Sequence, residues 1–379
     1  MARRIILDPN ASPAAAVRNP FVGRVLMMDL PLAFSSLAVC ALGLVILYSA
    51  VDQNMPLLVR QGIRLSVAVV AFVVAAQVSP STLRMWTPWI FLASVGLLLW
   101  VLVDGVVGNG AQRWLDWGII RFQPSEILKL SVPLMIAWYM HERALPPNAI
   151  NLGVLICIVS VPTLLILRQP DLGTAALVFA AGALTVLLAG VRLRVIALFS
   201  VLALGMAPVL WTTMLDYQRA RVLTFLNPES DPLGAGYNII QSKIALGSGG
   251  LSGRGWLNGT QSHLEFLPER STDFIFAVMG EEFGLLGLLF LLGLYLVVVG
   301  RGLYIASQAQ DNFDRLLAGG ISLTFFLHVF VNAGMVCGLL PVVGVPLPLI
   351  SLGGTSMVTL MAGLGILTAI HGNRRLLVT

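Results

Sequence analysis

An aspartate at the start of a long apolar segment is the sharpest candidate for catalysis in this sequence. Asp273 follows Thr272 and precedes the apolar run 274–280. A carboxylate beside apolar residues can take a proton from a hydroxyl group, and such general-base assistance contributes about 10²–10⁴ in rate. Either Thr272 or Asp273 also suits a helix cap, and capping holds an aspartate ionised and weakens it as a base. The residues alone leave both roles open.

Two more carboxylates, Glu281 and Glu282, follow in the same segment. In one continuous helix they would lie about 12 Å or more beyond Asp273, with Glu281 rotated from it by about 80°. This separation argues against a pair of carboxylates that act on one sugar. Acids within a membrane helix are supporting candidates for function. A structural hydrogen bond to a neighbouring helix is an equal alternative.

A second group of charges opens another apolar segment. Glu126 and Lys129 follow Pro124, which suits the first turn of a helix. Because they are three residues apart, they share a helix face and can form an ion pair. That pair either neutralises itself within the membrane or leaves Lys129 able to contact a diphosphate. We keep both alternatives.

Three further runs complete the candidate chemistry. Arg113 precedes the Glu126 helix, and its guanidinium group fits phosphate oxygens, although an arginine beside Trp114 also suits an interfacial anchor. Asp171 lies in a tight turn at 168–174, where we expect it to cap a helix. The loop 338–349 is apolar and broken by prolines. Such backbone is tolerated in a membrane where it lines a cavity or is buried in protein. The loop suits a groove for a lipid tail, and packing within the protein is an equal alternative.

The elements that position these residues must be membrane helices. The chain has 379 residues, of which 57% are hydrophobic and only 11% are charged, whereas a soluble domain has roughly 25% charged residues. A spanning helix needs about 20 apolar residues. We therefore predict an all-α bundle of about ten transmembrane helices, at residues 30–50, 61–78, 86–104, 124–141, 149–167, 172–190, 193–213, 272–300, 315–338 and 350–371.

Lysine and arginine placement predicts that both chain ends face the cytoplasm. The predicted organisation is a cytoplasmic tail at 1–28, helices one to seven at 29–213, a large periplasmic loop at 214–271, helices eight to ten at 272–372, and a tail at 373–379. A loop of this length is either functional or disordered. We expect order, because the loop holds an amphipathic stretch and two aromatic anchors, Trp256 and Phe266. The sequence has no basic stripe interleaved with aromatics, so nucleic acid is not an expected partner.

Together these motifs resemble those of the SEDS family of shape, elongation, division and sporulation proteins. The runs at 113–115, 123–126 and 170–173, the run around Asp273 and the proline-rich loop occur in the order typical of that family, from about residue 110 to 360. The segments 227–237 and 247–251 match its large loop. The residue sequence of the Asp273 run and the short N-terminal tail are more similar to the elongation branch of the family than to its division branch.

The resemblance implies a peptidoglycan glycosyltransferase of the bacterial inner membrane, with its site facing the periplasm. Family members transfer the disaccharide of lipid II to the 4-hydroxyl of an acceptor strand, release undecaprenyl diphosphate and invert the anomeric configuration. The resemblance implies that Asp273 is the general base. It also implies that Arg113, Lys129 and Glu126 contact the diphosphate or set the geometry of the site.

The resemblance also implies partners. These are a class B penicillin-binding protein, which is a transpeptidase, and membrane proteins of the elongation complex such as MreC and MreD. No carboxylate cluster with metal-binding spacing is evident, and the sequence leaves open whether a divalent cation, magnesium or manganese, accompanies the diphosphate. Two other functions stay as alternatives: a flippase for lipid II, which needs no general base, and a scaffold without enzymatic activity.

Overall fold

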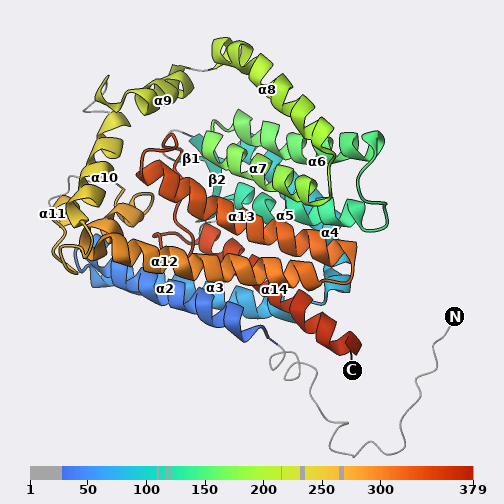
Figure 1. Cartoon of the computed structure of the whole chain (residues 1–379), viewed down its shortest axis with the longest axis horizontal. Helices are drawn as coiled ribbons and strands as arrows, with labels where there is room; N and C mark the ends of the chain where they lie inside the picture. The colour runs from blue at the N-terminus through green and yellow to red at the C-terminus, as the bar shows by residue number, and fades with distance from the viewer. Residues whose placement is uncertain are drawn as a thin grey trace, which may run out of the picture.

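The computed structural model describes residues 28–108, 111–116, 118, 121–214, 216–230, 235–263 and 269–378. Nearly all of the predicted N-terminal tail, residues 1–27, lies outside the described residues, as do 264–268, which precede the Asp273 turn. The remaining residues form one predominantly helical bundle, with helices running side by side in Figure 1.

Each apolar segment predicted as a span contains a helix. Their bounds are α2 (Leu30–Ala50), α3 (Met55–Gln77), α4 (Pro80–Asp104), α5 (Pro124–Met140), α6 (Ala149–Arg168), α7 (Leu172–Leu188), α8 (Leu193–Thr213), α12 (Ile275–Gln308), α13 (Asn312–Val336) and α14 (Thr355–Val378). Seven of them, α2, α3, α4, α6, α12, α13 and α14, are long and apolar enough to cross a membrane. The all-α membrane architecture is confirmed, while the count of about ten spans stays a prediction.

Polar side chains fix where several of these helices begin. Asp29, Asn54, Ser79, Asn148 and Asp171 each accept a hydrogen bond from a backbone N–H three residues further on, at the start of α2, α3, α4, α6 and α7. An N-cap satisfies a donor that the helix leaves unpaired, and each such cap stabilises by about 1 kcal/mol. The cap that the sequence predicts at Asp171 is therefore present.

Helix α13 lies at the centre of the bundle. It packs against α12, α7 and α5, while α14 packs along α3 and α2 packs along α12 (Figure 1). Its buried side chains include Phe313, Phe325 and three polar residues that face the site described below. A polar side chain placed on α13 can therefore reach several other helices.

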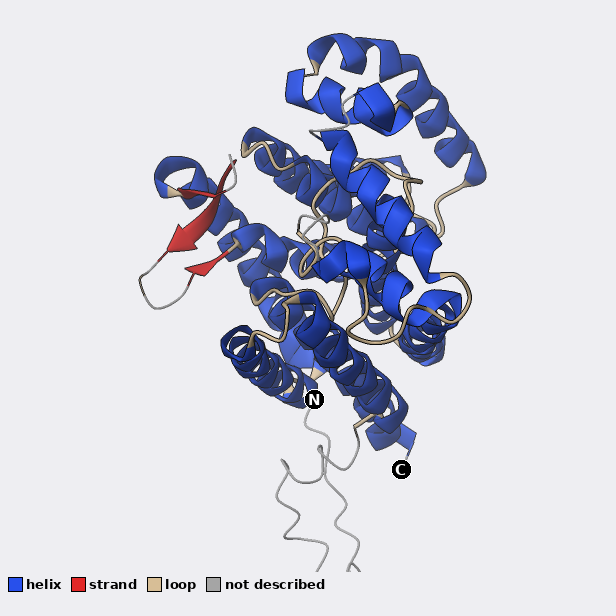
Figure 2. Ribbon diagram, turned by 90° about the vertical axis from the view of Figure 1, so that its left-hand side faces the viewer, coloured by secondary structure: helices blue, strands red, loops and turns tan. Residues whose placement is uncertain are grey.

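A small antiparallel sheet joins α4 to α5, which the sequence analysis did not predict. Its strands β1 (Val106–Gly108), β2 (Ala111–Asp116) and β3 (Arg121–Phe122) are ordered β1-β2-β3 and stand at one side of the bundle in Figure 2. These strands are too short for a clear alternating pattern. The sheet matters because β2 carries Arg113.

The long polar segment 214–271 also contains regular structure. It holds α9 (Asp216–Leu226), a 3-10 turn η2 (Pro228–Ser230), α10 (Ala235–Gly249) and the short α11 (Thr260–His263). Helix α10 packs on α12 and α13, where the Ser242 hydroxyl donates to the Val336 carbonyl over 3.0 Å. In Figure 1, α8 and α9 arch over the bundle and lead down to α10. That the segment faces the periplasm stays a prediction.

Helix α12 is not one continuous helix, which corrects the span predicted at 272–300. Gly284 has φ 64° and ψ −164°, a backbone conformation outside the helical region. The backbone groups at the break bond to the loop 250–255, through the N–H groups of Leu285, Leu286, Arg254 and Gly255. A short helix of nine residues, 275–283, thus precedes the longer part that begins at Leu285. The glutamates Glu281 and Glu282 belong to the short part.

Candidate active site

Asp273 lies in the turn before α12, and its carboxylate does not cap that helix. The N-cap residue of α12 is Phe274, and no side chain makes a cap hydrogen bond there. The hydroxyl of Thr272 instead donates to Glu269. The capping alternative is therefore wrong. Within the described part of the chain, the carboxylate of Asp273 has no hydrogen bond or ion pair, so it is available to a ligand.

A buried asparagine holds the backbone of this aspartate. The side-chain amide of Asn332, on α13, donates to the carbonyl of Asp273 over 2.8 Å and to that of Val345 over 2.7 Å. Asn332 is fully buried. A buried amide that bonds two carbonyls must keep both, because an unpaired buried polar group costs about 1–3 kcal/mol. Asn332 therefore ties the Asp273 turn to the proline-rich loop.

The two residues before Asp273 are fixed in the same way. The carbonyl of Ser271 accepts from the backbone N–H of Leu352 over 2.8 Å, and the carbonyl of Thr272 accepts from the hydroxyl of Ser351. Ser351 is itself tied to α3, since the Gln61 amide donates to its carbonyl over 3.2 Å. Three successive carbonyls of the turn are thus anchored, so the backbone that carries the Asp273 side chain is held in place.

The surroundings of Asp273 raise the pKa of its carboxyl group. Burial and, to a lesser extent, the charge of Glu269 raise the pKa while the charge of Arg113 lowers it, and together they bring the pKa to about 6. The carboxylate faces Gly344, where a Cβ would lie 3.5 Å from Oδ2. A carboxylate with a pKa near the working pH is suited to general-base catalysis.

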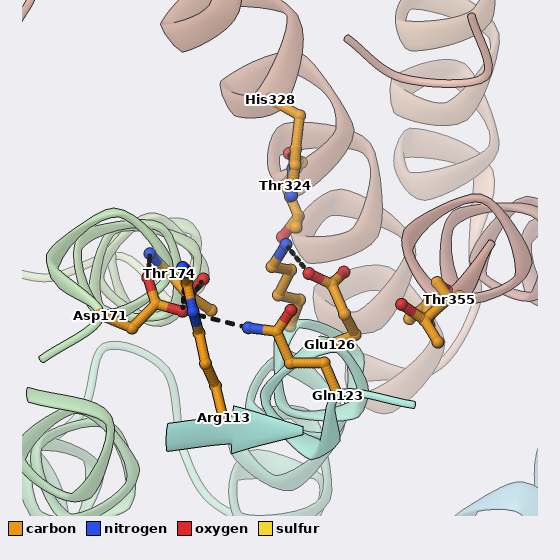
Figure 3. A network of polar contacts seen from close by, with 10 residues as sticks. Arg113, Gln123, Glu126, Asp171, Thr174, Thr324, His328 and Thr355 are labelled. Carbon is orange, nitrogen blue, oxygen red and sulfur yellow. Dashed lines mark hydrogen bonds and ion pairs between the residues drawn. The ribbon is translucent and has the colours of Figure 1, made fainter. Parts of the chain in front are cut away.

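Arg113 belongs to a network at the sheet end of the bundle (Figure 3). Its Nη1 lies 3.4 Å from Oδ2 of Asp171, which also accepts from the Gln123 amide over 3.0 Å and from the Thr174 hydroxyl over 2.9 Å. Arg113 is 26% exposed, and no group in the described part of the chain bonds its buried Nε atom. The ion pair argues against a simple interfacial anchor. It leaves part of the guanidinium group open to a further anion.

The ion pair predicted from spacing between Glu126 and Lys129 is present and buried. Lys129 Nζ lies 2.7 Å from Glu126 Oε1, and both residues are less than a tenth exposed. Among the described residues, the second oxygen of Glu126 has no hydrogen-bond partner. Figure 3 shows Thr324 and His328 of α13 near Glu126, and the Nδ1 N–H of His328 donates to the Thr324 carbonyl over 2.8 Å. The Nε2 atom of His328 is buried and has no partner in the described part of the chain.

Glu281 and Glu282 are not brought together with Asp273. Oε1 of Glu281 accepts from the Gln261 backbone N–H over 2.9 Å and from the Thr260 hydroxyl over 3.2 Å. Oε1 of Glu282 accepts from the hydroxyl of Ser49 on α2. Both glutamates are buried. These contacts favour the structural alternative, in which they tie the short part of α12 to α11 and α2.

The sequence analysis missed the polar residues of α13. Thr324, His328 and Asn332 stand four residues apart in the second half of α13, where the other residues are apolar, so they form a stripe on one face. Polar residues within a membrane helix are functional candidates by default, and this spacing was a usable signal. Ser351 offered no such signal, because its contact with Thr272 depends on the tertiary fold. Among the described residues, no group of three or more His, Cys, Asp or Glu side chains is arranged to hold a metal ion.

Residues 24–376 match the family of cell cycle proteins that groups FtsW, RodA and SpoVE. The chain belongs to this family, the SEDS family. The peptidoglycan glycosyltransferase MrdB of Escherichia coli K12 is 50% identical over 342 residues, which cover 90% of this chain and 92% of MrdB. A probable peptidoglycan glycosyltransferase FtsW of Geobacter metallireducens is 36% identical, over 89% of this chain and 93% of that protein.

Solved structures agree with this SEDS assignment. One chain comes from a study of the structural coordination of polymerization and crosslinking by a peptidoglycan synthase complex, and matches with a TM-score of 0.81 and 33% identity over 92% of this chain and 98% of that chain. The rod shape determining protein RodA of Thermus thermophilus matches with a TM-score of 0.70 and 29% identity, over 92% and 97% of the two chains. The family expected from the motifs is confirmed.

Proposed function

We propose that this SEDS protein is a peptidoglycan glycosyltransferase of cell elongation that polymerises lipid II, with Asp273 as its general base. The activity is supported by the similarity to MrdB, which is named a peptidoglycan glycosyltransferase. Half of the aligned residues are identical between the two proteins, and the alignment covers 90% of this chain. The observation that carries the mechanism is the Asp273 carboxylate, which has no partner within the described residues and stands on an anchored backbone. Neither a flippase nor a scaffold needs such a group.

The proposed step is a direct displacement. Asp273 takes the proton of the acceptor 4-hydroxyl as the hydroxyl oxygen forms a bond to the anomeric carbon of the donor sugar. The bond from that carbon to the diphosphate oxygen breaks, its electron pair leaves with undecaprenyl diphosphate, and the configuration inverts. The raised pKa of Asp273 suits this role, since it brings the group near neutral pH.

Two cations support the departure of the diphosphate. Negative charge grows on the leaving group in the transition state, and fixed cations in a site with little water stabilise it strongly. Arg113 is positioned by Asp171, and Lys129 is positioned by Glu126. We assign diphosphate contact to both cations, and a positioning role to the two carboxylates. No step requires Glu281 or Glu282.

The proposal includes a location and a partner. Apolar helices make this a multi-pass membrane protein. We place it in the inner membrane with both ends in the cytoplasm and Asp273 at the periplasmic face, as the charge bias in the sequence suggests. The similar chain from a peptidoglycan synthase complex supports a class B penicillin-binding protein as partner. MreC and MreD remain expected members of the same assembly.

The decisive experiment measures glycan strands formed from purified lipid II. Wild type is compared with Asp273→Ala, each co-purified with its penicillin-binding partner after the transpeptidase is blocked. We expect polymer from the wild type and none above background from the variant, with lipid II binding retained. The matched control is Glu269→Ala, which removes an exposed carboxylate four residues away and should keep measurable activity.

Other outcomes would contradict the proposal. Equal polymer from wild type and Asp273→Ala would remove Asp273 from the chemistry. If folded, partner-bound wild type makes no polymer, transport of lipid II between the leaflets of proteoliposomes would favour the flippase. Absence of both activities would favour the scaffold.

A further inference from the structure

A basic pocket lies at the end of the bundle opposite Asp273. It has a volume of about 390 Å³ and is lined from the start of α4 and the end of α5, by Ser81, Arg84, Met85, Trp138, His141, Glu142 and Arg143. Helix α4 runs the length of the bundle from this pocket to the sheet that carries Arg113. The pocket is therefore separate from the candidate active site.

Neither arginine of the pocket is neutralised by an ion pair. Arg84 donates to Nε2 of His141, and Arg143 stacks on the Tyr139 ring, 3.7 Å from its centroid. No carboxylate among the described residues lies within ion-pair distance of either guanidinium group; Asp314 of α13 acts on Arg84 only through longer-range attraction. With Glu142 as the acidic side chain of its lining, the pocket keeps a surplus of positive charge.

His141 orients one of these arginines. An arginine can only donate, so its bond to Nε2 makes that nitrogen an acceptor and places the imidazole proton on Nδ1, which is buried. The two guanidinium groups match an anion with several oxygens, such as a phosphodiester.

The surface beside the pocket is suited to acyl chains. Met85, Trp89 and Leu92 of α4 are 64%, 66% and 59% exposed, and they lead from the pocket along the outside of the bundle. Tryptophan is enriched where a membrane protein meets the head-group region. A free phosphate would use only the polar part of this arrangement, whereas a phospholipid would use both parts.

We propose that the pocket binds the head group of an acidic phospholipid, in the leaflet at the end of the bundle where α2 begins and α14 ends. Basic pockets between membrane helices bind such head groups by charge and by hydrogen bonds from arginine. A zwitterionic lipid gains less, because its own cation is repelled by Arg84 and Arg143. The site would select acidic lipids without taking part in glycosyl transfer.

The test uses the full chain in nanodiscs of phosphatidylcholine, with or without phosphatidylglycerol. Native mass spectrometry of the released protein measures the lipids that stay bound. The pocket variant combines Arg84→Gln with Arg143→Gln. The matched control combines Arg192→Gln with Arg194→Gln, two exposed arginines at the start of α8, just after Gly190, which lies beside Pro146 at the same end of the bundle.

We expect wild type and control to retain phosphatidylglycerol over phosphatidylcholine, and the pocket variant to lose that preference by about tenfold or more. Polymerisation of lipid II should persist in both variants. The proposal is overturned if the pocket variant keeps the preference, if the control loses it equally, or if inorganic phosphate alone displaces the retained lipid. If the double variant does not fold, the same lipid-retention measurement is made on the single variant Arg143→Gln, which should fold because this side chain is exposed.

Discussion

The side-chain amide of Asn332 donates to the backbone carbonyl of Asp273 over 2.8 Å, and joins α13 to the turn that carries the proposed base. The same amide holds Val345 in the proline-rich loop. The position of the base thus depends on a residue that touches no substrate. We regard Asn332 as a positioning residue.

Asn332→Leu should lower turnover more than it lowers affinity. Leucine has a similar size but cannot hold the Asp273 carbonyl, and a displacement of about 1 Å in a catalytic group can cost about 10²-fold in rate. We expect kcat to fall on that order while KM for lipid II stays nearly constant, since the contacts of Arg113 and Lys129 are unchanged. Steady-state polymerisation assays separate the two constants.

The control for this variant is Ser322→Ala, which removes a buried hydroxyl from the same helix; within the described residues this hydroxyl bonds only to the Ala318 carbonyl. It should leave kcat unchanged. A purely structural role for Asn332 would lower the melting temperature with no change in kcat for the folded fraction, and that result would contradict positioning.

The pH dependence of polymerisation should report the charge of Asp273. A base must be ionised, and burial with the charge of Glu269 raises the pKa of Asp273 to about 6. Activity should therefore fall as the pH drops through this value. Glu269→Gln removes the neighbouring negative charge and keeps a similar shape, so it should lower the pKa of Asp273 and move the acid limb to lower pH.

The profile of kcat/KM against pH measures this limb in the free enzyme. As a comparison, Glu229→Gln removes an exposed carboxylate from η2 and should leave the limb in place. A limb that stays at the same pH in Glu269→Gln would show that another group titrates there.

The helices and the principal charges could be predicted from the sequence because both leave local signals. Apolar runs of about 20 residues mark membrane helices, and the three-residue spacing of Glu126 and Lys129 marked a pair that the structure shows at 2.7 Å. These features depend on residues that are near one another in the chain.

The rest depends on contacts between distant segments. The hydrogen bond from Asn332 to the Asp273 carbonyl joins residues 59 positions apart in the sequence, and the hydroxyl of Ser351 bonds to the carbonyl of Thr272, 79 positions away. The break at Gly284 was missed because glycine is common in apolar helices, and its positive φ becomes visible only when the loop 250–255 pairs beside it. The sequence alone could not decide whether Thr272 or Asp273 caps α12, because the answer depends on how this turn is held in the fold.

The ion pair of Glu126 and Lys129 can be tested for function apart from stability. Lys129→Met alone leaves a buried carboxylate without its partner and should cost about 3–5 kcal/mol in the free energy of unfolding. The double variant Glu126→Leu with Lys129→Met replaces the pair by apolar groups, which is often neutral for stability. We expect the double variant to recover stability but not polymerisation, if Lys129 contacts the diphosphate.

Thermal unfolding in detergent and the lipid II assay give the two readouts. Recovery of both stability and polymerisation in the double variant would assign the pair to self-neutralisation alone. The single variant Glu126→Gln keeps a hydrogen-bond acceptor for Lys129 and should lose less stability than Lys129→Met, since no negative charge is left unpaired.

Gly284→Ala should disrupt the junction between α12 and the loop at 250–255. Gly284 has φ 64°, which is costly for a residue with a Cβ, and that Cβ would lie 2.3 Å from the Gly253 nitrogen. Gly293→Ala is the matched control in the same helix, where an added Cβ meets nothing within 4 Å. Alanine there should be neutral or stabilise by about 0.5–1 kcal/mol.

Size-exclusion profiles and melting temperatures of the two variants measure the difference. If both variants behave alike, the break at Gly284 does not hold the two parts of α12 in place.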